Sequence, residues 1–227
     1  MIKINNLTKK YKDKLAVDNL NLEIKTGELF SLLGTNGAGK TTTIKMLSTL
    51  ILPTSGEVEI NNLDLVKDSS KIKEIINISP QETAVASNLT VLENLYFMAG
   101  IYQTPNKEDK IKELIKLFKL EEVLKQKAKT LSGGYQRKLS IAISLINNPK
   151  ILFLDEPTLG LDVISRHDLW KVIELLKGKT TIILTTHYME EAEVLSDRIG
   201  IMNKGKLIEL GTSKELIKKA NTNNFED

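Results

Sequence analysis

Short apolar runs, each followed by a polar turn, recur along the chain and predict strands. Residues 29–33 (LFSLL) and 151–154 (ILFL) are almost wholly apolar, which is typical of strands buried on both faces of a parallel sheet. Less regular apolar patterns predict further strands at residues 2–7, 17–24, 74–79 and 181–186. Polar turns at Asn61-Asn62 and at residues 203–205 predict two antiparallel hairpins.

Helical periodicity marks the middle of the chain. Two stripes place apolar residues at i, i+3, i+4 and i+7: Ile111, Leu114, Ile115 and Phe118, and then Leu139, Ala142, Ile143 and Ile146. We expect the first stripe to pack into a core rather than to lie on a membrane. The pattern predicts further helices over residues 41–50, 165–177 and 189–197.

The order of these elements indicates an α/β protein. Strands that alternate with helices imply right-handed crossovers and a mainly parallel sheet. The hairpins predict an antiparallel β subdomain, and the helical stretch from about residue 84 to residue 147 predicts a helical subdomain inserted into the sheet. The length of 227 residues fits a single domain over residues 1–227.

Composition excludes several classes of protein. No cysteine is present, so disulfides and thiolate metal sites are excluded. No apolar run approaches the roughly 18 residues that span a bilayer, and the start, MIKINNLTKK, lacks a secretory apolar region. We therefore expect a cytoplasmic protein. The 32 basic residues are nearly balanced by 29 acidic ones and include only three arginines, so no nucleic-acid partner is expected.

A glycine-rich loop follows the first buried strand. The segment GTNGAGKT matches the pattern G-x-x-x-x-G-K-[ST] and comprises Gly34, Thr35, Asn36, Gly37, Ala38, Gly39, Lys40 and Thr41. Glycines let backbone N–H groups turn towards a polyphosphate, and the helix that follows adds its positive end. Lys40 is expected to reach the β and γ phosphates, the Thr41 hydroxyl to ligate Mg²⁺, and Thr42 to complete the nucleotide site.

Two carboxylates follow the second buried strand. Asp155 and Glu156 end the run ILFLDE, and ligands of open α/β sheets bind at the carboxyl ends of strands. We expect Asp155 to hold Mg²⁺, directly or through water. Glu156 is expected to orient or deprotonate an attacking water. By itself such a pair is often only a solvated strand end; the phosphate-binding loop favours the functional interpretation.

The segment Leu131-Ser132-Gly133-Gly134 precedes a predicted helix. Ser132 alone would be a plain helix cap. Two glycines are poor helix formers, however, and they suit a backbone that closely approaches an anion. The chain then has two anion-binding helix starts but one lysine-bearing loop. One nucleotide can be clamped from both sides if two chains pair head to tail across a two-fold interface.

These segments together resemble the nucleotide-binding domain of ATP-binding cassette (ABC) proteins. The resemblance spans essentially the whole chain in the family's order: the Walker A loop GTNGAGKT, Gln81, the signature LSGGYQRKL, Walker B ILFLDE, the D-loop LGLD at residues 159–162, and His187. It implies a P-loop NTPase core that binds ATP and Mg²⁺. Thr35 departs from the family, which often has proline there, and this should not disturb the loop.

The resemblance also implies roles for single residues. Tyr11 is expected to stack on adenine; the alternative is a surface tyrosine. Gln81 would touch Mg²⁺ or the attacking water and report the nucleotide state to a membrane partner. His187 would hold the γ-phosphate and the water, and the alternative is a core histidine. His167 matches no family position and is interpreted as structural.

Further roles concern the second chain. Ser132, Gly133 and Gly134 would contact the γ-phosphate bound by the opposite subunit, and Asp162 would couple the two sites. The partner would be a second nucleotide-binding subunit, identical or different. A separate transmembrane permease would dock near Gln81 and the helical subdomain.

The family resemblance implies an ATPase that drives transport from the inner face of the cell membrane, to which it binds peripherally. The stretches TTHYMEEAEVLSDRI and PTLGLDVISRHDLW resemble subunits of drug or antibiotic export systems. Two other classes stay open. One is a non-transport ABC ATPase that acts on ribosomes or DNA, and the other is a nucleotide-dependent regulatory protein that hardly turns over.

Overall fold

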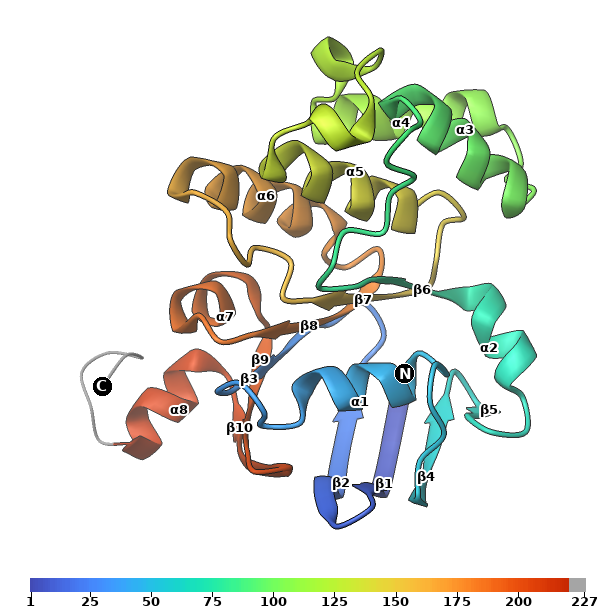
Figure 1. The fold of residues 1–227 in the computed structure, drawn as a ribbon. Coiled ribbons are helices and arrows are strands. Elements are labelled where there is room, and N and C mark those ends of the chain that lie inside the picture. The colour runs from blue at the N-terminus through green and yellow to red at the C-terminus, as the bar shows by residue number, and fades with distance from the viewer. Residues whose placement is uncertain (221–227) are drawn as a thin grey trace.

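The structure is a computed structural model, and it describes residues 1–220. Its centre is a sheet of six strands in the order β10-β9-β3-β8-β7-β6 (Figure 1). These strands are β3 (Leu29–Leu33), β6 (Ile76–Ser79), β7 (Ile151–Asp155), β8 (Thr181–Thr186), β9 (Arg198–Asn203) and β10 (Lys206–Gly211). All neighbours in this sheet are parallel except the β9–β10 hairpin. The predicted, mainly parallel sheet is thus confirmed.

A second sheet of four antiparallel strands lies on one side of the first. Its order is β2-β1-β4-β5, and its strands are β1 (Ile2–Tyr11), β2 (Lys14–Ile24), β4 (Ser55–Ile60) and β5 (Leu63–Asp64). Asn61 and Asn62 turn the β4–β5 hairpin with left-handed φ angles of 52° and 64°, a conformation that asparagine tolerates. Helix α1 (Lys40–Leu47) packs between the two sheets, where Ile44, Met46 and Leu47 are fully buried.

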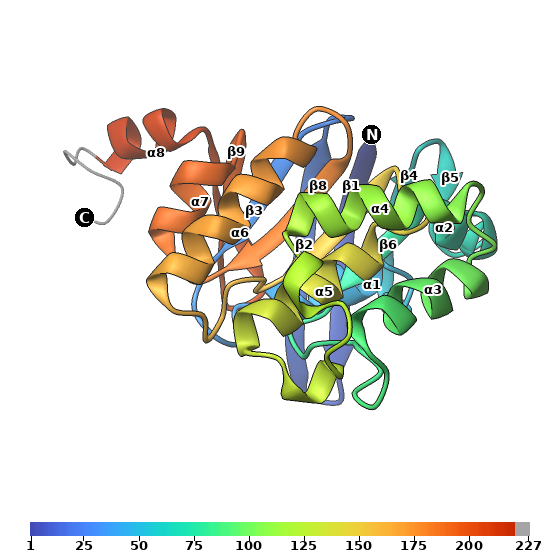
Figure 2. The ribbon, with the colours of Figure 1, turned by 90° about the horizontal axis from the view of Figure 1, so that it is seen from above.

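Helices cover the opposite face of the central sheet (Figures 1 and 2). Between β6 and β7 the chain forms α3 (Val91–Ile101), α4 (Lys107–Phe118), two short 3₁₀ turns at Glu121–Val123 and Ala128–Thr130, and α5 (Gly133–Ser144). Helices α6 (Val163–Leu176) and α7 (Met189–Leu195) complete this layer. Ile111, Leu114 and Phe118 are buried in its core. The stripe therefore packs inside, as expected.

Some element boundaries differ from the prediction. Helix α1 ends at Leu47 rather than at residue 50, because Thr49 turns left-handed with φ 61° before Pro53 is reached. The start of the predicted strand 74–79 belongs to helix α2 (Ser69–Ile75), which is anchored by the buried Ile72. Helix α8 (Ser213–Ala220) was not predicted. The last seven positions of the predicted domain, 221–227, lie outside the described residues.

Within residues 1–220, no helix has the length and apolar character that crossing a membrane requires.

Candidate functional site

A hollow of about 300 Å³ lies over the start of α1. Its lining comes from the phosphate-binding loop, the start of β2 and the segments at the ends of β6 and β7: Lys14, Ala16, Asn36, Gly37, Ala38, Gly39, Lys40, Thr41, Thr42, Gln81 and Glu156. A larger, mainly apolar cavity of about 660 Å³ borders Gly34, Thr35, Asn36 and His187. It lacks the lysines, so we assign the polyphosphate site to the smaller hollow.

Gly39 shows why the loop needs glycine. Its φ of 107° is left-handed, and a Cβ at this position would lie 2.5 Å from the backbone oxygen of Ala16. Gly37 is also left-handed, with φ 82°, but a Cβ there would meet nothing within 4 Å. At Gly39 any side chain would clash with the neighbouring backbone. At Gly37 there is room for a side chain, and glycine is favoured only because the φ angle is left-handed.

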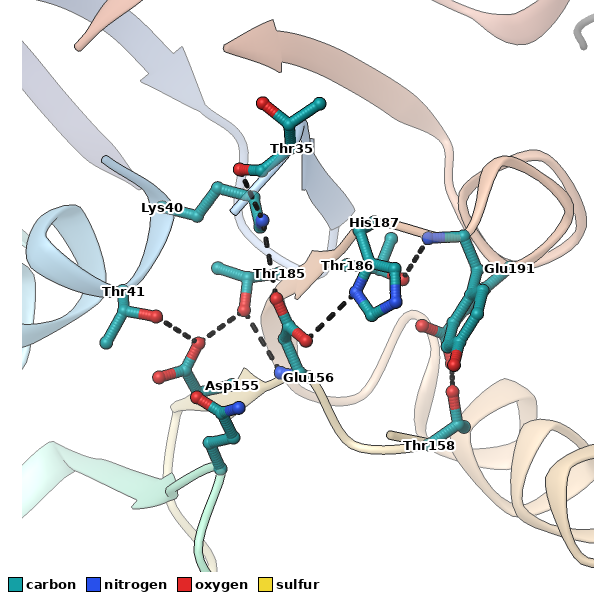
Figure 3. A network of polar contacts seen from close by, with 12 residues as sticks. Thr35, Lys40, Thr41, Asp155, Glu156, Thr158, Thr185, Thr186, His187 and Glu191 are labelled. Atoms are coloured by element: carbon teal, nitrogen blue, oxygen red, sulfur yellow. Dashed lines mark hydrogen bonds and ion pairs between the residues drawn. The ribbon is translucent and has the colours of Figure 1, made fainter. Parts of the chain in front are cut away.

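Lys40 is buried at the first position of α1 and is 4% exposed. Its ammonium donates to the backbone oxygens of Gly34 at 2.6 Å and Thr35 at 3.2 Å, so the lysine stretches back along the loop (Figure 3). This placement holds a positive charge inside the hollow, where phosphate oxygens are to bind.

Asp155 lies at the end of β7 and faces Thr41. Its Oδ1 accepts hydrogen bonds from the Thr41 hydroxyl at 3.1 Å and the Thr185 hydroxyl at 2.5 Å. A hydroxyl and a carboxylate oxygen, held side by side at the phosphate-binding loop, form a donor set that suits Mg²⁺, which takes few protein oxygens. The residues present thus fit such an ion, and Thr41 and Asp155 are the two that would hold it.

Glu156 connects the loop lysine with the histidine. Its Oε1 lies 3.3 Å from the Lys40 ammonium, and its Oε2 lies 3.0 Å from Nδ1 of His187 (Figure 3). Glu156 itself is left-handed, with φ 48°, a costly conformation for a residue with a Cβ. Its amide is held by the backbone oxygen of Thr185 at 3.1 Å and by the Thr185 hydroxyl at 3.0 Å. This backbone strain aims the carboxylate at the hollow.

Gln81 lines the hollow from the segment after β6. Arg137 of α5 holds that segment by donating to the backbone oxygens of Pro80, at 2.7 Å, and Gln81. Burial lowers the pKa of Arg137, and the charge of Asp155 opposes this effect. Arg137 follows the segment Ser132-Gly133-Gly134 on the same helix, so the start of α5 and Gln81 belong to one connected unit.

The remaining predicted residues lie elsewhere. Tyr11 ends β1, is 45% exposed and does not line the hollow formed by residues 1–220; the Lys9 ammonium lies 5.1 Å from its ring centroid. His167 is exposed on α6 and lies edge-on to Trp170, with 4.8 Å between the ring centroids.

Ser132 and Asp162 lie at neighbouring helix starts. Ser132 caps α5 by accepting from the amide of Tyr135, and Asp162 caps α6 by accepting from the amide and hydroxyl of Ser165. These bonds from Ser165 lower the pKa of Asp162. A Cβ on Gly134 would lie 2.9 Å from the Ser165 hydroxyl oxygen, so the two helix starts adjoin. Among the described residues, neither start contributes to the lining of the hollow.

Sequence reasoning missed three residues of this site. Thr185 bonds Asp155 and the Glu156 amide. Arg137 holds the Gln81 segment. Glu191, on α7, is fully buried beside the loop that follows Glu156. In the sequence, Glu191 is only the second acidic residue in the first turn of a short helix. Acidic residues are common at that position even when they are exposed, so the sequence did not mark Glu191 as buried.

Comparison with known proteins agrees with this geometry. A family model described as ABC transporter matches residues 17–159. The phospholipid-transporting ATPase ABCA3 of Homo sapiens is 43% identical over 224 residues, which cover 96% of this chain but 13% of ABCA3. The linearmycin resistance ATP-binding protein LnrL of Bacillus subtilis is 41% identical over 219 residues, which cover 95% of this chain and 70% of LnrL.

A solved structure is also similar. It is the dimeric ATP-binding cassette MJ0796 in a post-hydrolysis state bound to ADP and Pi, and it superposes with a TM-score of 0.84 and 30% identity. The match covers 93% of this chain and 98% of that one. With this fold, these motifs and these relatives, the chain belongs to the ABC transporter family and forms its ATP-binding cassette.

Proposed function

We propose that this chain binds and hydrolyses ATP with Mg²⁺ and drives export through a separate membrane-spanning partner. One observation carries the proposal: Lys40, Glu156 and His187 form a continuous chain of contacts next to the Thr41–Asp155 pair. Phosphoryl transfer depends chiefly on positioning and on stabilising charge. This arrangement supplies a cation, a pair of metal-binding oxygens and a base within one hollow.

The loop residues from Gly34 to Thr42 would hold the triphosphate, with Lys40 on the β and γ phosphates. Thr41 and Asp155 would hold Mg²⁺, with Gln81 at its edge. When bound, the ion neutralises charge on the phosphate oxygens. Lys14 lines the same hollow from the first position of β2 and adds positive charge to it. Tyr11, at the end of β1, would stack on adenine from outside the hollow.

Glu156 would orient the attacking water and accept its proton. Its carboxylate is close to fully buried, and His187 lies on its far side from Lys40. His187 would hold the γ-phosphate and keep the carboxylate in place. Because the amide of Glu156 is fixed by Thr185, the base has little freedom to turn away from the hollow.

Two chains would pair head to tail. Ser132, Gly133 and Gly134 begin a helix that does not line the hollow of its own subunit, so they are free to close the site of a partner. Asp162, at the adjoining helix start, would couple the two sites. The dimeric form of MJ0796 supports the pairing. The second subunit is either an identical chain or a related cassette.

The chain spans only 13% of the length of ABCA3. That this chain works as part of a complete transporter is therefore a proposal. We propose one cassette over residues 1–227 with a helical insertion at about 84–147, bound to the inner face of the cell membrane through a permease. ABCA3 is a phospholipid-transporting ATPase and LnrL is a linearmycin resistance protein, and these two relatives support a role of this chain in export.

Phosphate release from the purified chain tests this function. The rate should depend on Mg²⁺ and should rise faster than linearly with protein concentration, because two chains form each site. Membranes that carry the permease should change the rate. A chain that hydrolyses ATP at full rate as a strict monomer would contradict the proposed pairing. A chain that binds ATP but does not hydrolyse it, with or without these membranes, would be the regulatory alternative.

A further inference from the structure

Glu191 is a fully buried carboxylate that the proposed mechanism does not use. It lies in the first turn of α7, four residues after His187, and has 0% exposure. Its Oε1 accepts a hydrogen bond from the Thr158 hydroxyl at 2.8 Å (Figure 3). The same oxygen accepts a second hydrogen bond, from the Trp170 indole N–H at 2.9 Å. A buried carboxyl group is costly unless it is hydrogen-bonded, and these two donors satisfy Oε1 of Glu191.

Glu191 connects the chain segment that follows the base, Glu156, with the turn that follows His187. Thr158 lies two residues after Glu156 and is itself fully buried. His187, whose Nδ1 contacts Glu156, begins the turn that leads into α7. Trp170 comes from α6, the helix that Asp162 caps. One oxygen of Glu191 thus ties together the segment after the base, the helix after Asp162 and the helix after the histidine.

We propose that Glu191 is a positioning residue for the hydrolysis reaction: it fixes the Glu156–Thr158 segment against the His187 turn. It touches no reacting group and acts through Thr158 and the α7 backbone. This inference rests on the proposed function. It adds a residue that belongs neither to the phosphate-binding loop nor to the acidic pair and that is distinct from His187.

The second carboxyl oxygen of Glu191 takes no part in these contacts. Oε2 of Glu191 has no hydrogen-bond partner among the described residues. Burial raises the pKa of Glu191, against the opposing effect of the hydroxyl and indole donors and of the Arg166 charge. The Arg166 guanidinium itself lies over the Tyr188 ring, 4.3 Å from its centroid. Both hydrogen bonds go to Oε1, so a side chain of the same shape with one acceptor oxygen should replace Glu191.

This leads to a conservative and a disruptive variant. Glu191→Gln keeps the acceptor for Thr158 and Trp170, and we expect kcat within about three-fold of the wild type. Glu191→Leu removes the acceptor and leaves two buried donors unpaired. We expect kcat to fall about ten-fold or more, because small displacements of a catalytic group cost that much. KM for ATP should stay unchanged, since the phosphate-binding loop is not touched.

Trp170 gives a readout that does not depend on hydrolysis, because it is the only tryptophan of the chain. The indole N–H signal in an ¹⁵N NMR spectrum should shift and exchange faster with solvent in Glu191→Leu but not in Glu191→Gln. If the wild type hydrolyses no ATP under any condition, the proposed function fails, while this signal still tests the contact. An indole signal that is unchanged in Glu191→Leu overturns the inference.

Glu28 offers a matched control. It is also a largely buried carboxylate and pairs with Arg198 at 2.7 Å, but it precedes the amino end of β3, away from the hollow. Glu28→Leu should lower stability and leave kcat unchanged. A comparable loss of kcat in this control would mean that any buried-charge defect slows the chain, and would overturn the role of Glu191.

A second variant keeps the inference testable if Glu191→Leu does not fold. Thr158→Val deletes only the hydroxyl that reaches Glu191 and keeps the packing volume. It should lower kcat at constant KM, and Thr158→Ser should restore kcat. A folded Thr158→Val with wild-type kcat would show that the Glu191–Thr158 contact does not position the base.

Discussion

The ammonium of Lys40 lies 3.3 Å from Oε1 of Glu156, and both side chains are almost completely buried. The residue proposed to hold the γ-phosphate is therefore paired with the residue proposed to activate water. A triphosphate that enters the hollow competes with the Glu156 carboxylate for the Lys40 charge. Removal of the charge at position 156 should then affect ATP binding and ATP hydrolysis in opposite directions.

Glu156→Gln is the direct test of this relationship. We expect hydrolysis to fall by about a hundred-fold or more, the usual effect of losing a general base. ATP affinity should be kept or increased, since the competitor for Lys40 is gone, and an ATP-bound dimer should accumulate. Phosphate release, nucleotide titration and sedimentation measure the three effects. The exposed Glu57→Gln serves as a control, and a Glu156→Gln protein that hydrolyses at the wild-type rate would refute the base assignment.

Lys40→Ala should weaken ATP binding. A charge-assisted hydrogen bond contributes roughly 1.5–3 kcal/mol, so the Kd should rise about ten- to a hundred-fold. Lys45 lies on the same helix, is exposed, and makes a matched control. Lys45→Ala should bind ATP like the wild type. Equal ATP affinity in Lys40→Ala and Lys45→Ala would contradict the assignment of the loop.

Ser132→Arg should block dimer closure. The long cationic side chain would project from the start of α5, where the partner's phosphates are to dock. Loss of the helix cap alone costs only about 1 kcal/mol, so Ser132→Ala should still dimerise, as should the exposed Ser70→Arg near the start of α2. An ATP-dependent dimer of Ser132→Arg that sediments as strongly as the wild type would argue against the contribution of this helix start to a second chain.

The sequence predicted well those parts of the fold that local pattern controls. The two apolar runs became β3 and β7, because a strand covered on both faces has to be apolar throughout. The loop between β3 and α1 and the carboxylates after β7 follow from these strands. Ser132 caps α5, as its position before the predicted helix suggests, whereas the cap that Asp162 forms on α6 was not predicted.

Contacts between distant segments could not be predicted in this way. Thr185 meets Asp155 across 30 positions, and Arg137 meets the Pro80 oxygen across 57. Nothing near either residue in the sequence marks such a partner, because the contact arises only when neighbouring strands and the α5 helix are assembled. Glu191 was missed for the same reason: its burial depends on α6 and on the loop after β7.

The ionisation of Glu191 predicts a pH dependence of stability. Burial raises the pKa of Glu191 above its ordinary value of 4.5, so above that pH the folded chain binds more protons than the unfolded chain. Its contribution to stability is therefore complete below pH 4.5 and is lost as pH rises through the folded pKa. The slope can reach about 1.4 kcal/mol per pH unit. The facing charge is that of Arg166 on α6. Thr158 and Trp170 donate hydrogen bonds to the carboxyl group, and the Thr186 hydroxyl also opposes the rise of the pKa.

Urea unfolding of the wild type and of Glu191→Gln between pH 4 and pH 8 isolates this effect, because glutamine does not titrate. The free energy of unfolding of the wild type should fall relative to that of the variant as pH rises. Glu93 gives a control of opposite sign. Hydrogen bonds from the backbone and side chain of Thr90 lower the pKa of Glu93. The wild type should therefore lose stability relative to Glu93→Gln as pH falls below the ordinary pKa. A difference between the wild type and Glu191→Gln that stays constant or grows with pH would show that Glu191 is charged in the folded chain, and that its second oxygen has a partner.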